Sequence, residues 1–112
     1  RDKGSECTYA TPELTKHDLQ FMVVKGVIVR VDIENDRSIT TDTGIRIGDS
    51  EARIKQIYGR RLLVEPHEYV RGGHYFKIRE GKLGLVFETD GKNVTTFRSG
   101  RLPEVEWIEG CF

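Results

Sequence analysis

Two histidines and two glutamates lie within ten positions of one another near the middle of this chain. The segment Glu65-Pro66-His67-Glu68-Tyr69 is followed, after a short gap, by His74-Tyr75. Imidazole and carboxylate groups bind divalent metals, and an imidazole is also a general base near neutral pH. The spacing is not that of a histidine pair on one helix face, and Gly72-Gly73 between the two histidines predicts a loop or hairpin.

This loop has two interpretations. In the first, His67 and Tyr69 are structural and hydrogen-bond the backbone of an exposed loop. In the second the loop binds a partner, because loops held on rigid scaffolds are where recognition residues collect. We therefore predict a binding surface, without a metal or other cofactor, at these residues: His67, Glu68, Tyr69, Arg71, His74 and Tyr75.

A different chemistry, that of an aspartic protease, is suggested by the triplet Asp42-Thr43-Gly44. Two carboxylates share one proton in such enzymes, so a chain of this length would supply one half-site of a homodimer. The triplet is usually preceded by apolar residues and followed by a small one, whereas here Thr40-Thr41 precede it and Ile45 follows. We interpret the triplet as a turn that leads from a strand into a helix.

The charge and hydropathy of the chain exclude some partners. Lys plus Arg and Asp plus Glu number 18 each, so the formal net charge is zero. Binding of nucleic-acid phosphates needs a clustered excess of cations, and we predict no nucleic-acid partner. No apolar run approaches the roughly 20 residues that cross a bilayer, and we predict no transmembrane segment. Four arginines could form a local basic patch, but we interpret them as solvated strand ends: Arg60, Arg61, Arg98 and Arg101.

The two cysteines, Cys7 and Cys111, lie near opposite ends of the chain. A bridge between them would close nearly the whole chain into one loop and would stabilise the fold by roughly 4–5 kcal/mol in the loop-entropy description. It would also require an oxidising compartment. The alternative is a pair of free, buried thiols in a cytosolic protein. We predict the disulfide, because the cysteines are even in number and terminal, and no metal-ligand spacing accompanies them.

Regular structure must position these groups. We predict one short amphipathic helix, at about residues 50–58. Asp49 or Ser50 can cap its first turn, and Gly59 can end it in a left-handed conformation. Such a short helix is not stable alone in water, so it must lie on another element. Its apolar positions follow the i, i+3, i+4 spacing of one buried face: Ile54, Ile57 and Tyr58.

An antiparallel sheet is the predicted partner of this helix. Leu19–Val24 and Val27–Ile33 are rich in β-branched and aromatic residues and flank Lys25-Gly26, which predicts an N-terminal hairpin. The second of these segments alternates as a strand with one buried face would: Val27, Val29, Val31 and Ile33. Five further strands are predicted after the helix: Leu62–Glu65, His74–Arg79, Leu83–Glu88, Asn93–Arg98 and Val105–Ile108.

Side-chain alternation also predicts which residues these strands bury. Trp107 alternates with Glu104 and Glu106 and is predicted to face the opposite side of the last strand. The chain is therefore predicted to be a single α+β domain, residues 1–112, with a β-meander sheet, a helix on one face and its termini tied by the disulfide. The predicted inner face of the sheet comprises Phe76, Ile78, Leu83, Leu85 and Phe87.

Several segments of the chain resemble a group of uncharacterised bacterial exported proteins. Members carry a Cys-x-Tyr near the start, here Cys7-Thr8-Tyr9, and a Glu-Gly-Cys at the end, here Glu109-Gly110-Cys111. They often have a further segment before the first cysteine, which this sequence lacks. The resemblance implies a periplasmic or extracellular location and implies no particular activity. It extends over nearly the whole chain through these segments: Phe21–Val24, Arg30–Asp32, Thr41–Tyr58, Pro66–Tyr69 and Phe87–Gly91.

More distantly, the glycines and helix entry between Gly44 and Gly59 resemble those of the β-lactamase-inhibitor-protein and SmpA/BamE-type lipoprotein modules. Those are α+β binding modules rather than enzymes. They use a pair of helices where this chain has a single predicted helix.

Two functional hypotheses follow. The first is a non-enzymatic exported module that binds a protein or a cell-envelope component through the sheet face and the His67–Tyr75 loop. The second is a small hydrolase or metal-dependent enzyme that uses Asp42 or the His67/His74 loop. Because the sequence begins with Arg1 rather than Met, we expect a processed or trimmed chain whose export signal has been removed. The sequence makes no prediction of the oligomeric state.

Overall fold

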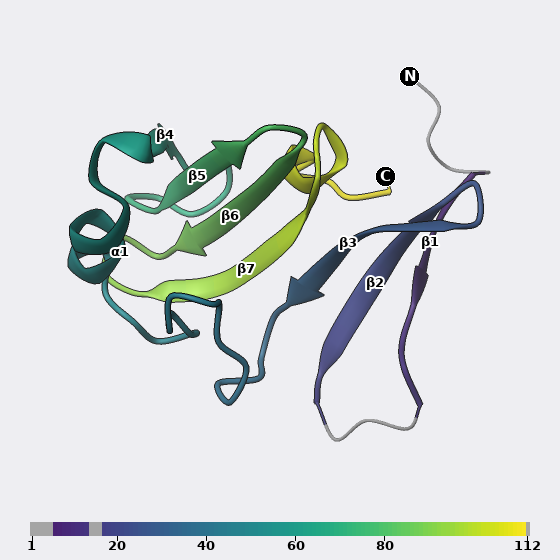
Figure 1. Cartoon of the computed structure of the whole chain (residues 1–112). Helices are drawn as coiled ribbons and strands as arrows, with labels where there is room; N and C mark the ends of the chain where they lie inside the picture. Colours follow the sequence, from purple (N-terminus) through teal and green to yellow (C-terminus); the bar gives the residue numbers. More distant parts are fainter. Residues whose placement is uncertain (1–5, 14–16, 112) are drawn as a thin grey trace.

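A computed structural model describes residues 6–13 and 17–111 of the protein (Figure 1). The expected processing at Arg1 lies outside these residues. The described elements follow in this order: β1 (Cys7–Ala10), β2 (Leu19–Val24), β3 (Val27–Ile33), α1 (Glu51–Tyr58), η1 (Gly59–Arg61), β4 (Leu63–Pro66), β5 (His74–Glu80), β6 (Leu83–Thr89), β7 (Val94–Arg101) and η2 (Glu104–Glu106).

The described strands form one antiparallel sheet in the order β1-β2-β3-β7-β6-β5-β4. Strands β4 to β7 follow one another as a meander, and β7 then pairs with β3. The predicted α+β class, with an antiparallel sheet and one short α-helix, is confirmed. The predicted N-terminal hairpin is only part of a three-stranded unit, because β1 pairs with β2 and was not predicted.

Helix α1 lies across the part of the sheet formed by β5, β6 and β7 (Figure 1). The Ser50 hydroxyl accepts a hydrogen bond from the Arg53 N–H at 3.1 Å, so Ser50 rather than Asp49 caps the helix. Gly59 ends it with a φ of 54°, a conformation that favours glycine. The prediction of the buried helix face is wrong at one position, since Ile57 is 38% exposed.

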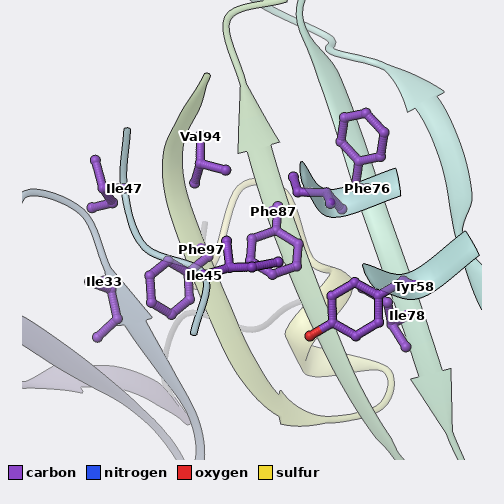
Figure 2. Packing of buried hydrophobic residues seen from close by; sticks show 10 residues of the cluster. Ile33, Ile45, Ile47, Tyr58, Phe76, Ile78, Phe87, Val94 and Phe97 are labelled. Carbon is purple, nitrogen blue, oxygen red and sulfur yellow. The ribbon is translucent and has the colours of Figure 1, made fainter. Parts of the chain in front are cut away.

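The main hydrophobic core lies between α1 and the sheet. Phe76, Phe87 and Phe97 are direct neighbours across β5, β6 and β7. Figure 2 shows this row with side chains from the 34–50 connection and the helix packed over it. Of the predicted inner face, Phe76, Ile78 and Phe87 are buried and Leu85 is half-buried. The prediction is wrong for Leu83, which is 61% exposed at the start of β6.

Strand β3 departs from the predicted alternation. Met22 pairs with Arg30 whereas Val23 pairs with Ile28, so Val29 is the extra residue of a β-bulge. Val29 packs with Met22 in a second buried cluster, away from the main core. The prediction of a single buried face along β3 is therefore wrong, since the bulge changes which face each residue meets.

The segment after β7 is not the predicted strand at Val105–Ile108. It forms η2 and a series of turns that cover the face of the sheet opposite α1 (Figure 1). The predicted disulfide joins Cys7 of β1 to Cys111 at the end of this segment. Trp107 packs against the cluster around that disulfide rather than alternating along a strand. In the described part of the chain, we find no helix with the length and apolar character needed to span a membrane.

Candidate functional site

The face of the sheet opposite α1 carries charged side chains on its central strands. Lys77, Val86, Arg98 and Asp32 lie in one row across β5, β6, β7 and β3. Lys77 and Arg98 are only 7% and 5% exposed. Buried cations are stable only when they are paired and hydrogen-bonded, so the partners of these side chains define the arrangement of the whole face. We call it the polar face.

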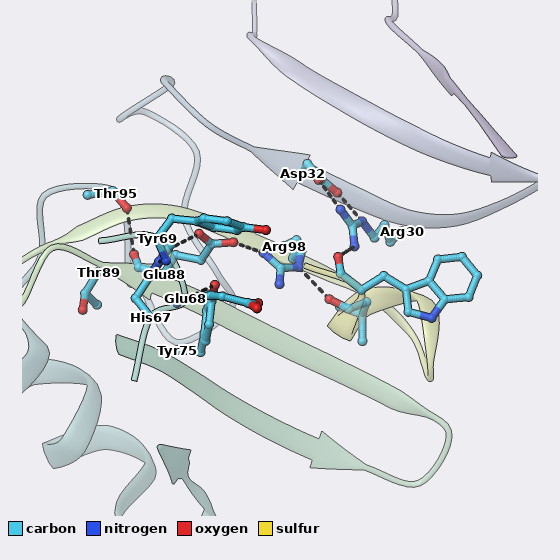
Figure 3. Close-up of polar contacts among 12 residues, drawn as sticks. Arg30, Asp32, His67, Glu68, Tyr69, Tyr75, Glu88, Thr89, Thr95 and Arg98 are labelled. Atoms are coloured by element: carbon cyan, nitrogen blue, oxygen red, sulfur yellow. Dashed lines mark hydrogen bonds and ion pairs between the residues drawn. The ribbon is translucent and has the colours of Figure 1, made fainter. Parts of the chain in front are cut away.

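His67 fastens the loop between β4 and β5 to the polar face (Figure 3). Its Nδ1 accepts hydrogen bonds from the backbone N–H groups of Tyr69 and Val70, both at 3.0 Å. Nδ1 therefore carries no proton, and Nε2–H donates to the Glu88 carboxylate at 2.7 Å. The imidazole also stacks on the ring of Tyr75 at 4.4 Å between centroids. Both ring nitrogens of His67 are thus used to fix residues 67–73, which we call the His67 loop.

Glu88 continues this network toward the C-terminal segment. Its second oxygen accepts a hydrogen bond from Nη1 of Arg98, so one carboxylate joins His67 to Arg98 (Figure 3). Nε of Arg98 donates to the Val105 carbonyl at 2.6 Å. This network links the His67 loop, the sheet and the C-terminal segment. Its hydrogen bonds are charge-assisted, and such bonds are about twice as strong as neutral ones.

Arg30 makes a second, equivalent connection from β3. It binds the Asp32 carboxylate through Nε and Nη2, both at 2.8 Å. Its Nη1 donates to the carbonyls of Glu104 and Trp107 at 2.8 and 2.9 Å. Two buried arginines therefore hold the backbone of the C-terminal segment against the sheet.

The protonation of neighbouring groups follows from the same contacts. Burial raises the pKa of the Tyr75 phenol above its ordinary value, although the Glu68 N–H, which donates to its oxygen, acts in the opposite direction. Glu106 accepts two hydrogen bonds from Arg79, at 2.6 and 2.7 Å, and these hold the pKa of its carboxyl below the ordinary value. Burial opposes that shift, and the nearby charge of Lys77 supports it.

His74 lies on the other face of the sheet. It is two residues from Phe76 of the main core, and its Nδ1 lies 2.8 Å from a carboxylate oxygen of Glu51 in α1. The Thr89 hydroxyl donates to the same oxygen. Burial alone would raise the pKa of Glu51, but the hydrogen bonds from Thr89 and His74 outweigh it and lower that pKa.

The structure therefore does not bring the predicted histidines His67 and His74 into one site. In residues 6–13 and 17–111, no three His, Cys, Asp or Glu side chains are grouped to hold a metal ion. The other predicted binding residues divide by exposure. Tyr75 is buried and supports the loop, whereas Glu68, Tyr69 and Arg71 are exposed.

Asp42 is exposed beside a separate cavity of about 260 Å³ under the C-terminal end of α1. Thr43 bonds the Tyr58 hydroxyl at 2.8 Å, and the Gly44 N–H donates to the Thr41 carbonyl. These contacts are those of a turn that positions the chain before α1, as we interpreted the triplet.

The central residues of the polar face were not predicted from the sequence: Arg30, Glu88 and Arg98. The interpretation of Arg98 as a solvated strand end is wrong, since its guanidinium is buried. The available signal was the recurrence of charged residues at the non-core positions of adjacent central strands. A central strand that is charged on its second face needs a cover that can accept hydrogen bonds.

The charged side chains also border a cleft of about 330 Å³ between the polar face and Ile108–Gly110. Its walls include Arg30, Asp32, Glu88 and Arg98, each already bonded to other groups of the protein. The cleft is therefore a space beside a structural network.

Comparison with known proteins gave no match to a family model, a curated protein or a solved structure. The resemblances to exported bacterial proteins and to SmpA/BamE-type modules stay predictions.

Proposed function

We propose that this chain is a non-enzymatic, exported binding module that recognises a protein or a cell-envelope component through the His67 loop. The observation that carries the proposal is the contrast within this loop. Its backbone is fixed by the buried His67, while Tyr69 and Val70 are 65% and 40% exposed. Arg71 is exposed beside them.

Rigid display of an aromatic residue favours binding for two reasons. Tyrosine is among the residues that contribute most to interface affinity. A loop that is already ordered also loses less conformational entropy when a partner binds. The His67 loop combines both properties.

The proposed location outside the reducing cytosol is supported by the bridge between Cys7 and Cys111, because such bonds persist in oxidising compartments. Recognition is favoured over catalysis because both nitrogens of His67 already bind protein groups. A metal or substrate could use that imidazole only by releasing the loop.

Site-specific photocrosslinking in the cell envelope tests this proposal. A photoreactive residue at position 69 should yield a discrete covalent adduct, and the matched control at Leu83, exposed in β6, should not. Adding Glu88→Ala to the position-69 variant should reduce the adduct, because the loop loses its anchor. The absence of any adduct at position 69, or equal adducts at positions 69 and 83, would contradict recognition by this loop.

A further inference from the structure

Strand β4 is an edge of the sheet, with β5 on one side of it and, among the described residues, no strand on the other. All four of its residues are exposed, and Leu63 and Val64 are 43% and 48% exposed. An open edge with apolar side chains is a template for pairing with another strand, unless its backbone groups are blocked.

The pattern of hydrogen bonds shows which backbone groups of β4 point outward. His67 follows β4 in the same register, and its N–H donates to the Gly73 carbonyl. Antiparallel pairs alternate with a period of two, so Glu65 and Leu63 also direct their N–H and C=O groups toward β5. Val64 therefore directs both of its groups outward. It is the one residue of β4 that can donate there, since Pro66 has no N–H.

Such an edge accepts only a short and specific partner. An antiparallel strand that presents one outward residue opposite Val64 can form two hydrogen bonds with it. A second copy of β4 has this residue, because a two-fold axis at Val64 pairs its N–H with the Val64 carbonyl of the other copy, and the reverse. A longer strand finds no further donor on β4, because Pro66 has no N–H and the Leu62 N–H is bonded to the Gly59 carbonyl.

The charges at the two ends of β4 fit the same arrangement. Arg60, in η1, and Glu68, in the His67 loop, lie four residues before and four residues after Val64, and both are exposed. An antiparallel two-fold axis at Val64 therefore brings Arg60 of each copy to the end of the strand where Glu68 of its partner lies. Opposite charges meet at both ends, so the edge is complementary to itself.

We propose that β4 pairs with β4 of a second copy of this chain, which extends the two sheets into one. The pairing forms two backbone hydrogen bonds at Val64, covers Leu63 and Val64, and places two Arg60–Glu68 pairs at its ends. Because the strand is short, the dimer is weak and concentration-dependent. The pairing uses Glu68 of the His67 loop but none of the exposed side chains of Tyr69, Val70 and Arg71, on which the proposed recognition rests.

Sedimentation velocity of the oxidised, full chain from micromolar to millimolar concentration tests the proposal. The weight-average mass should rise toward twice the chain mass. Arg60→Glu and Glu68→Arg should each weaken association roughly tenfold through like-charge contacts. The double variant should restore it. The matched charge reversal Lys82→Glu, in the turn before β6, should have no effect.

A second variant tests the backbone contacts directly. Val64→Pro removes the outward N–H without removing a hydrogen bond to β5, and it should abolish the dimer while circular dichroism shows a folded chain. If this variant does not fold, the charge-reversal set decides alone. A chain that is monomeric at every concentration, a dimer unaffected by Val64→Pro, or single reversals that the double variant does not rescue would overturn the proposal.

Discussion

Glu88→Ala should be far more destabilising than a glutamate deletion on the surface usually is. The carboxylate is 18% exposed and accepts hydrogen bonds from His67, which is 6% exposed, and Arg98, which is 5% exposed. Its removal leaves the Arg98 guanidinium buried, with the Val105 carbonyl as its one remaining acceptor among those described above. Breaking a buried pair by removing one partner costs about 3–5 kcal/mol. We expect a loss of that size from a domain whose total stability is about 5–15 kcal/mol.

Glu80→Ala is the matched control, because it makes the same chemical change on the same sheet. Glu80 lies 2.9 Å from Arg61, but the two side chains are 84% and 55% exposed. Exposed pairs contribute about 0–1 kcal/mol, so this variant should be close to the wild type. The free energies come from urea unfolding of the oxidised proteins at pH 7, followed by the fluorescence of Trp107, the single tryptophan.

Equal losses of stability for the Glu88 and Glu80 variants, within the roughly 0.5 kcal/mol expected of ordinary surface substitutions, would refute a stabilising role for the buried Glu88 contacts. A double variant gives an independent check. Combining Glu88→Ala with Arg98→Met removes both charges, so its cost should be smaller than the sum of the single costs. Additive costs would show that the buried guanidinium does not depend on Glu88.

Three further predictions concern the rest of the fold. Replacing both Cys7 and Cys111 by Ala should lower the unfolding free energy by about 4–5 kcal/mol, measured by urea titration, because the bridge closes nearly the whole chain. Glu106→Gln should make the free energy of unfolding fall less steeply below about pH 4.3, the ordinary pKa of glutamate. The pKa of Glu106 is lowered in the folded protein, so the stability that its carboxylate contributes is lost as the pH falls through this lowered pKa. Gly100→Ala should destabilise the fold strongly in thermal unfolding, because a Cβ there would lie 2.3 Å from the Val29 carbonyl oxygen.

Each of these has an outcome that would contradict it. Equal stabilities of the oxidised protein and the double-alanine variant would show that the bridge does not constrain the unfolded chain. Identical acid limbs for the wild type and Glu106→Gln would remove the role of the Arg79 contact. A wild-type melting temperature for Gly100→Ala would mean that β3 and β7 can move apart at Gly100 without loss of stability.

Local sequence pattern predicted the structure correctly where one whole face of a helix or strand is either buried or exposed. The helix end at Gly59 and the buried row through Phe76 and Phe87 follow from local periodicity and backbone chemistry. It failed at Val29, because a bulge inserts a residue without a marker in the sequence. It also missed β1, whose four residues are held in place by β2 rather than by a pattern of their own.

The His67 loop and the polar face could be predicted only in part. The position of His67 in a loop and its structural contacts follow from the glycines and the aromatic residues around it. Its partner Glu88 could not be predicted, because the two residues are 21 positions apart and meet only when particular strands become neighbours. The same holds for Arg98 and the carbonyl of Val105, which meet only because the chain turns back after β7.

The C-terminal segment shows why residue composition alone led to a wrong prediction of a strand. Residues 105–108 have the β-branched and aromatic character of a strand, and a strand must bond its carbonyls to a neighbouring strand. Here the carbonyls of Glu104, Val105 and Trp107 accept hydrogen bonds from Arg30 and Arg98 instead. The guanidinium groups thus take the place of a strand, and the segment in turn gives carbonyl acceptors to two buried cations. The polar face and its cover therefore supply each other with hydrogen-bond partners, and the disulfide to β1 fixes the end of the cover.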